Sequence, residues 1–247
     1  MENNNNPDYA YQNVVQINDA DASRKYLANV FLWMFGALAI SAIFAYEFFM
    51  TPSLLGLIVQ PTVNGGLAYT GLGYVAVFSP LIFSLVLSFG FNRISYPMMV
   101  FLFLAYAVMI GISFSVLGII YTSSSIFGVF LSSSVVFGIM AIAGYTTNMD
   151  LSKFGSILMM IFFAAFAVSF INFFLGSAQL QYIISFVFVI IMIGLTAYYM
   201  QMLKRIGAGL EYGAEESKKL VVIGAFILYT TFINLFISML RIFGRRS

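Results

Sequence analysis

Seven long apolar runs constrain this chain more than any other feature. Each has about the 17–25 residues that a bilayer core requires, and most charges fall between the runs. Backbone amide and carbonyl groups in lipid must bond within their own segment, so such runs form helices. The sequence therefore predicts an all-α membrane protein with seven transmembrane helices. The runs are approximately Leu27–Met50, Leu67–Phe91, Pro97–Tyr121, Ile126–Gly144, Phe154–Gly176, Leu180–Leu203 and Leu220–Phe243.

The composition agrees with a lipid environment. Of the 247 residues, 62% are hydrophobic and 8% are charged, whereas ordinary soluble domains carry about 25% charged residues. A soluble fold of this size could not bury so much apolar surface. The formal net charge of +2 also argues against nucleic-acid binding, which needs a clustered basic face. We therefore expect a lipid bilayer, and no nucleic acid, as a partner.

The absence of histidine and cysteine narrows the possible chemistry. Both residue types have a count of zero, which rules out a Ser–His catalytic pair, thiolate catalysis and the zinc site of intramembrane metalloproteases. Two serine clusters, Ser123–Ser125 and Ser132–Ser134, have no base near a candidate nucleophile. An intramembrane hydrolase is therefore disfavoured, and we expect neither an enzyme nor a bound cofactor.

The distribution of lysine and arginine predicts the orientation. Residues 1–26 are polar and are expected to form a flexible cytoplasmic tail, followed by a single transmembrane domain over residues 27–247. With the tail inside, the outside loops between spans carry no charge and the inside loops carry the basic residues, as the positive-inside rule requires. These are Arg24, Lys25, Arg93, Lys153, Lys204, Arg205, Lys218 and Lys219.

The carboxyl-terminal arginines disagree with this pattern. Arg241, Arg245 and Arg246 lie at or after the end of the last run, which seven crossings would place outside. Either the end of the chain is exported despite its charges, or the last segment re-enters the membrane and returns. We expect full crossing, because the first helix and the total loop charge usually dominate.

Three stretches carry a family resemblance. They are Gly144–Ser156 at the start of the fifth run, Gly194–Lys204 in the sixth, and Lys218–Gly244 in the seventh. Together they resemble the signature segments of the Bax-inhibitor-motif family of multi-pass membrane proteins, including its bacterial members. The resemblance implies a helical bundle with the last helix at its centre and the other six around it. It also implies a bacterial inner-membrane location.

The resemblance has a chemical consequence at Tyr199 and Thr231. The matching family positions are usually aspartates, and the resemblance implies that this pair senses pH and gates a calcium leak. Two close carboxyls can share a proton and titrate near neutral pH, whereas a phenol titrates near pH 10 and a threonine hydroxyl does not titrate. Two functions stay open: a leak for calcium or other small cations with altered gating, and a non-conducting protein that modulates another membrane complex, such as a quality-control protease.

A stripe of small and polar residues follows one face of the last run. Its spacings of seven, three, four and three residues are those of a single helix face. An amide facing lipid would lack partners, so this face is expected to point inward. The stripe could line a solvated pathway or serve helix packing alone, and both interpretations stay open. Its members are Gly224, Thr231, Asn234, Ser238 and Arg241.

Glu47 is the one acid inside an apolar run. An intramembrane acid is a functional candidate by default. Glu47 lies a few residues from the end of the first run, however, so it could equally be an interfacial carboxylate that reaches headgroup water.

Overall fold

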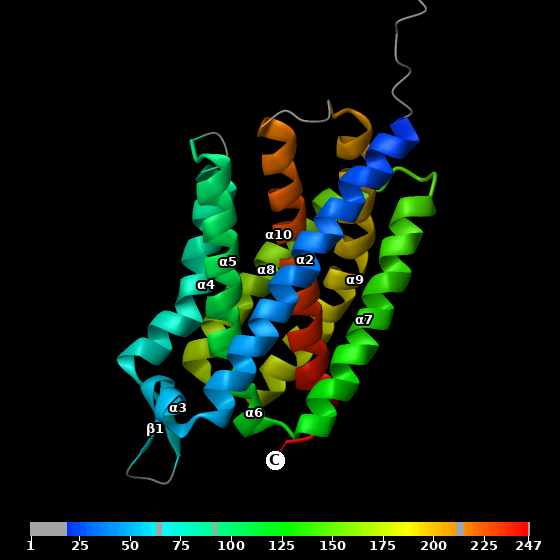
Figure 1. Cartoon of the computed structure of the whole chain (residues 1–247). Helices are drawn as coiled ribbons and strands as arrows, with labels where there is room; N and C mark the ends of the chain where they lie inside the picture. The colour runs from blue at the N-terminus through cyan, green and yellow to red at the C-terminus, as the bar shows by residue number, and fades with distance from the viewer. Residues whose placement is uncertain (1–18, 63–65, 91–92, 211–214, 247) are drawn as a thin grey trace, which may run out of the picture.

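The chain folds into a helical bundle in a computed structural model that describes residues 19–62, 66–90, 93–210 and 215–246 (Figure 1). Within these residues, six helices are long and apolar enough to cross a membrane, and α4 contains a shorter apolar segment. The all-helical, multi-pass membrane fold is therefore confirmed. The elements in chain order are α2 (Asp19–Met50), α3 (Pro52–Ile58), β1 (Val59–Pro61), β2 (Leu67–Tyr69), α4 (Gly71–Gly90), α5 (Tyr96–Phe114), α6 (Leu117–Ile120), α7 (Ser123–Thr146), α8 (Ser152–Leu175), α9 (Ala178–Ala208) and α10 (Glu215–Phe243).

The helices run back and forth between two ends of the bundle. Helices α2 and α10 both begin at the upper end in Figure 1 and finish at the lower end, where the carboxyl terminus lies. The end of the chain is held there, because the Thr122 amide donates to the Arg245 carbonyl (3.1 Å) and the Arg245 amide donates to Ser125 Oγ (2.9 Å). The last segment therefore does not turn back within the described residues.

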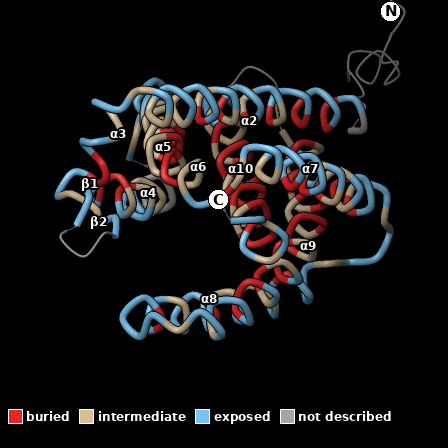
Figure 2. The backbone as a smooth tube through the Cα atoms, turned by 90° about the horizontal axis from the view of Figure 1, so that it is seen from below, coloured by how far each residue is buried: buried red, intermediate tan, exposed pale blue. Residues whose placement is uncertain are grey.

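Helix α10 lies between α2, α5, α7 and α9 (Figure 2). Its most apolar window is 61% buried, the largest share among the six candidate spans, whereas the window of α8 is 6% buried. This difference follows from sequence, since α10 carries hydroxyl and amide groups that lipid cannot satisfy, and the long apolar stretch of α8 can face lipid on most sides.

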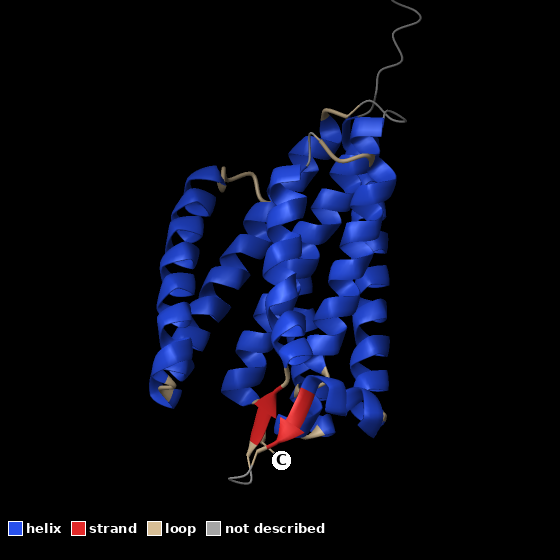
Figure 3. Ribbon diagram, turned by 90° about the vertical axis from the view of Figure 1, so that its left-hand side faces the viewer, coloured by secondary structure: helices blue, strands red, loops and turns tan. Residues whose placement is uncertain are grey.

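The second predicted run differs from the structure at its start. Leu67–Tyr69 is not the start of a span but strand β2, which pairs antiparallel with β1 in the register Val59↔Tyr69 (Figure 3). Strand residues are also apolar, so hydropathy alone merges the hairpin with the following helix. The third run is confirmed as a candidate span over Tyr96–Ile120, although the helix is interrupted between α5 and α6, where Ser115 Oγ donates to the Ile112 carbonyl (2.7 Å).

The first helix begins earlier than predicted. It starts at Asp19, so residues 19–26 of the expected flexible tail are helical. Ser23 Oγ donates to the Lys204 carbonyl (2.8 Å) and the Tyr26 hydroxyl donates to the Leu220 carbonyl (3.0 Å). These contacts dock the start of α2 on α9 and α10, which the polar composition of this segment did not indicate. Residues 1–18 of the predicted tail lie outside the described residues.

Close packing of α7 on α9 depends on Gly144. A Cβ added there would collide with the backbone of Ala197. We expect Gly144→Ala to lower the free energy of unfolding by about 1–3 kcal/mol, because the backbone of a packed interface cannot easily move to make room for the added methyl group. The measurement is thermal unfolding of the purified protein in detergent.

Gly138→Ala is the matched control on the same helix, since nothing lies within 4 Å of a Cβ at that position. Alanine is the better helix former, so this variant should be neutral or slightly more stable. Equal melting temperatures for the two variants would contradict the α7–α9 contact.

Candidate functional site

Tyr199 and Thr231 lie on neighbouring antiparallel helices, α9 and α10, which share the most extensive contact in the bundle. The half-buried Tyr199 donates its hydroxyl to Met159 Sδ on α8 (3.0 Å). Thr231 is buried, and its hydroxyl donates to the Ile227 carbonyl of its own helix (2.8 Å). The structure thus brings the two helices together but gives the two hydroxyls different partners. That these residues form one site stays a prediction.

The other residues of the α10 stripe do not share one environment. Gly224 allows close approach of α2 and α9, since a Cβ there would lie 2.9 Å from the Tyr26 hydroxyl and 3.0 Å from Leu203. Asn234 donates its amide to the Thr230 carbonyl (2.9 Å). Ser238 is buried, whereas Arg241 is exposed near the end of the helix. Thr231 and Asn234 therefore satisfy their donors on their own helix, as polar residues in membrane helices commonly do.

A buried hydroxyl chain joins three helices and was not found from sequence. Ser41 Oγ on α2 lies 2.6 Å from the Tyr229 hydroxyl on α10 and 2.7 Å from the Ala107 carbonyl on α5. A serine hydroxyl has one proton and two acceptor positions, so Tyr229 donates to Ser41 when Ser41 donates to the carbonyl. The sequence did not predict this contact, because the spans contain many serines and tyrosines and nothing distinguishes Ser41 and Tyr229 from the others.

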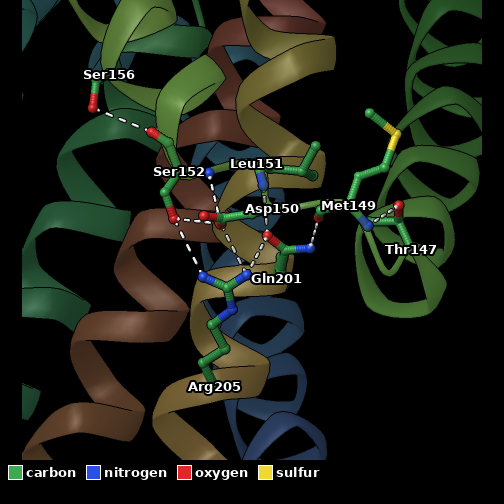
Figure 4. Close-up of polar contacts among 8 residues, drawn as sticks. All are labelled: Thr147, Met149, Asp150, Leu151, Ser152, Ser156, Gln201 and Arg205. Atoms are coloured by element: carbon green, nitrogen blue, oxygen red, sulfur yellow. Dashed lines mark hydrogen bonds and ion pairs between the residues drawn. The ribbon is translucent and has the colours of Figure 1, made fainter.

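A second polar cluster holds the α7–α8 loop on the end of α9 (Figure 4). The Gln201 amide bonds two backbone groups of the loop, because its Nε2 donates to the Met149 carbonyl (2.7 Å) and its Oε1 accepts from the Leu151 amide (2.9 Å). Arg205, one turn further along α9, reaches Asp150 Oδ1 (2.9 Å). We call Gln201, Arg205 and Asp150 the α9 clamp.

The charge of Asp150 is stabilised within the α9 clamp. Its Oδ1 accepts hydrogen bonds from Ser152 Oγ (2.8 Å) and from the Ser152 amide (3.2 Å), in addition to the contact with Arg205. These bonds, first of all the one from the Ser152 hydroxyl, lower the pKa of the Asp150 carboxyl below its ordinary value. Asp150 is therefore an exposed surface charge that also anchors its loop to α9.

Glu47 does not join these clusters. Its side chain is exposed, one turn before the end of α2 at Met50. Within the described parts of the chain, no three acidic, histidine or cysteine side chains come together in a way that could hold a metal ion.

Comparison with known proteins identifies the family. Residues 23–247 match the family model described as "Inhibitor of apoptosis-promoting Bax1". The chain belongs to this Bax-inhibitor-motif family. It is 34% identical over 223 residues to the inner membrane protein YbhL of Escherichia coli, a match that covers 90% of this chain and 92% of YbhL. Uncharacterized proteins of Borreliella burgdorferi and Rickettsia prowazekii are each 33% identical over 90% of this chain, and the matches cover 92% and 90% of those proteins.

Two of the three stretches that carried the resemblance meet in the α9 clamp. The Gly144–Ser156 stretch contributes the loop with Asp150, and the Gly194–Lys204 stretch contributes Gln201. Lys204 adds a third tie, because its ammonium donates to the Tyr145 carbonyl (2.8 Å) and lies 4.7 Å from the centre of the Tyr145 ring. In this Bax-inhibitor-motif protein, the signature segments therefore build contacts between α7, α8 and α9.

The α9 clamp should not respond to pH in the neutral range. A carboxyl whose pKa is lower in the folded state adds stability that is present above its unfolded pKa and lost as pH falls through the folded value. The melting temperature of Asp150→Asn should therefore lie below that of the parent by the same amount from about pH 5 to 8, and the gap should close below about pH 4. A gap that changes between pH 5 and 8 would contradict this assignment.

Proposed function

We propose that this protein crosses a bacterial inner membrane seven times, with α4 as the seventh span, α10 at the centre and the amino terminus in the cytoplasm. The inner-membrane location of the 34%-identical E. coli relative supports the compartment. Helix α4 has 20 residues, or about 30 Å at roughly 1.5 Å per residue, which matches a hydrocarbon core. The ends of the bundle also differ in charge, since the described basic residues before α10 gather at the end where α2 begins.

The topology is open to a direct labelling test, because the chain has no native cysteine. Single cysteines at Thr62, Ser124 and Ser177 would lie at the same end of the bundle, two of them in connections and the one at Ser124 in the first turn of α7. All three should react with a membrane-impermeant thiol reagent added to intact cells, whereas a cysteine at Ser152, at the opposite end, should not. Labelling of some but not all of the three sites would contradict seven crossings.

For the activity, we propose a leak for calcium or another small cation that lacks the proton-controlled gate of its relatives. The proposal rests on the family resemblance, which implies two carboxylates at the positions where this chain has the hydroxyls of Tyr199 and Thr231 on packed helices. Hydroxyl oxygens can coordinate a passing cation weakly, but they cannot change charge between pH 5 and 8. We propose no catalytic activity.

The second candidate is a non-conducting protein that modulates another membrane complex, such as a quality-control protease. Two observations favour it. The described buried side-chain polar atoms all have hydrogen-bond partners, so the bundle needs no internal water to satisfy them. Helix α8 packs chiefly on α9 and leaves large apolar side chains uncovered, including Phe166, Phe170 and Phe174.

Calcium flux into liposomes that contain the purified protein separates the two candidates. For the leak, we expect flux above that of empty liposomes, with less than about a twofold change between pH 5 and 8, because the described part of the chain holds no pair of buried acids to titrate. Flux equal to that of empty liposomes at every pH would favour the modulating protein. A sharp change in flux between acid and neutral pH would contradict the absence of a proton gate. The Glu47→Gln variant would then test whether Glu47 causes the pH dependence.

A further inference from the structure

A long apolar groove opens between α2 and α7, which pack on α9 and α10 but contact each other little. Two adjoining cavities of about 880 and 630 Å³ form it. They share lining residues from three helices, namely Leu38 and Ala42 on α2, Phe130 on α7 and Phe232 on α10. We call this feature the α2–α7 groove.

Helix α10 forms the floor of the groove through aromatic packing. The Phe232 ring meets the rings of Phe130 and Phe137 edge to face, each at a centroid distance of 5.5 Å. These contacts tie α7 to α10 on one side, while the Tyr229–Ser41 hydrogen bond ties α2 to α10 on the other. Both walls are thus anchored on the floor and not on each other, which leaves a fixed opening toward lipid.

The groove matches a phospholipid in length and charge. Along the larger cavity, from Arg24 to Ala42, α2 covers about 27 Å at roughly 1.5 Å per residue, which is long enough for one phospholipid, since one leaflet is half of the 40–45 Å of a bilayer with headgroups. Among the described lining residues, Arg24 alone is charged. Tyr145 lines the same cavity and has the Lys204 ammonium against its ring, so this end of the groove is electropositive.

We propose that the α2–α7 groove binds one anionic phospholipid from the leaflet at the start of α2, with its phosphate on Arg24 and an acyl chain along Phe35 and Leu38. The existing contact of Arg24 is an exposed ion pair with Asp21 at 3.6 Å, which a phosphate can replace at little cost.

The test uses the single native tryptophan, Trp33, which lies outside the groove lining. In a Trp33→Phe background, Phe35→Trp places a fluorescent reporter in the groove. Leu32→Trp is the matched control, because Leu32 is 70% exposed on the same helix but lines neither cavity. Full-length protein is reconstituted with phosphatidylglycerol or phosphatidylcholine brominated on the acyl chain, at a low mole fraction in unbrominated phosphatidylcholine.

We expect the Phe35→Trp reporter to reach half-maximal quenching at about fivefold less brominated phosphatidylglycerol than phosphatidylcholine, which corresponds to about 1 kcal/mol for one basic residue. Leu32→Trp should be quenched equally by both lipids. Arg24→Gln should remove the preference at Phe35→Trp, and Arg24→Lys should keep most of it.

Three results would overturn the proposal. Equal quenching of Phe35→Trp by both lipids would show that the groove contacts lipids without preferring anionic ones. A preference unchanged by Arg24→Gln would remove Arg24 as the headgroup site. No quenching of Phe35→Trp, with normal quenching of Leu32→Trp, would show that protein covers the groove, either a second copy or a partner helix. None of these results depends on cation flux.

Discussion

Lipid as a solvent is the constraint on which this structure depends. A polar group on a membrane span must find its partner within the protein, because hydrocarbon offers none. Helix α10, whose span carries hydroxyl and amide groups, is accordingly the most buried of the six candidate spans. Its Tyr229 bonds Ser41 of α2, and Ser41 in turn bonds α5, so one hydroxyl chain fixes three helices at the same depth. Charged side chains gather instead at the helix ends and form the α9 clamp.

The same constraint applies to the side chains at positions 199 and 231. A carboxylate in this interior would need a proton or a cation to balance it. The hydroxyls of Tyr199 and Thr231 need no such balancing charge, because they donate hydrogen bonds to a sulfur atom of α8 and a carbonyl of α10. Neither hydroxyl changes its charge near neutral pH, which is why we separate the proposed leak from proton control. Apolar surface that α10 leaves uncovered between α2 and α7 becomes available to a lipid.

The spans were predictable because their signal is local, whereas the contacts between them were not. Apolar runs located α7 to α10 within a few residues, and the resemblance pointed to the segments that form the α9 clamp. Hydropathy failed where apolar residues fold differently, as in strand β2, and where polar residues are helical, as at the start of α2. The contacts of Ser41 with Tyr229 and Ala107, and those of Gln201 with Met149 and Leu151, join residues 50 or more positions apart, and no spacing within one helix reveals them.

Placing acids at positions 199 and 231 tests most directly whether the two hydroxyls account for the proposed lack of proton control. Calcium flux would be measured in liposomes with Tyr199→Asp combined with Thr231→Asp, with each single change, and with asparagine at both positions as the uncharged control. We predict that the double aspartate variant gains pH-dependent flux between about pH 5 and 8, since repulsion between close carboxyls raises one pKa. The single and asparagine variants should show less. A correctly inserted double aspartate variant whose flux is flat with pH would contradict this account.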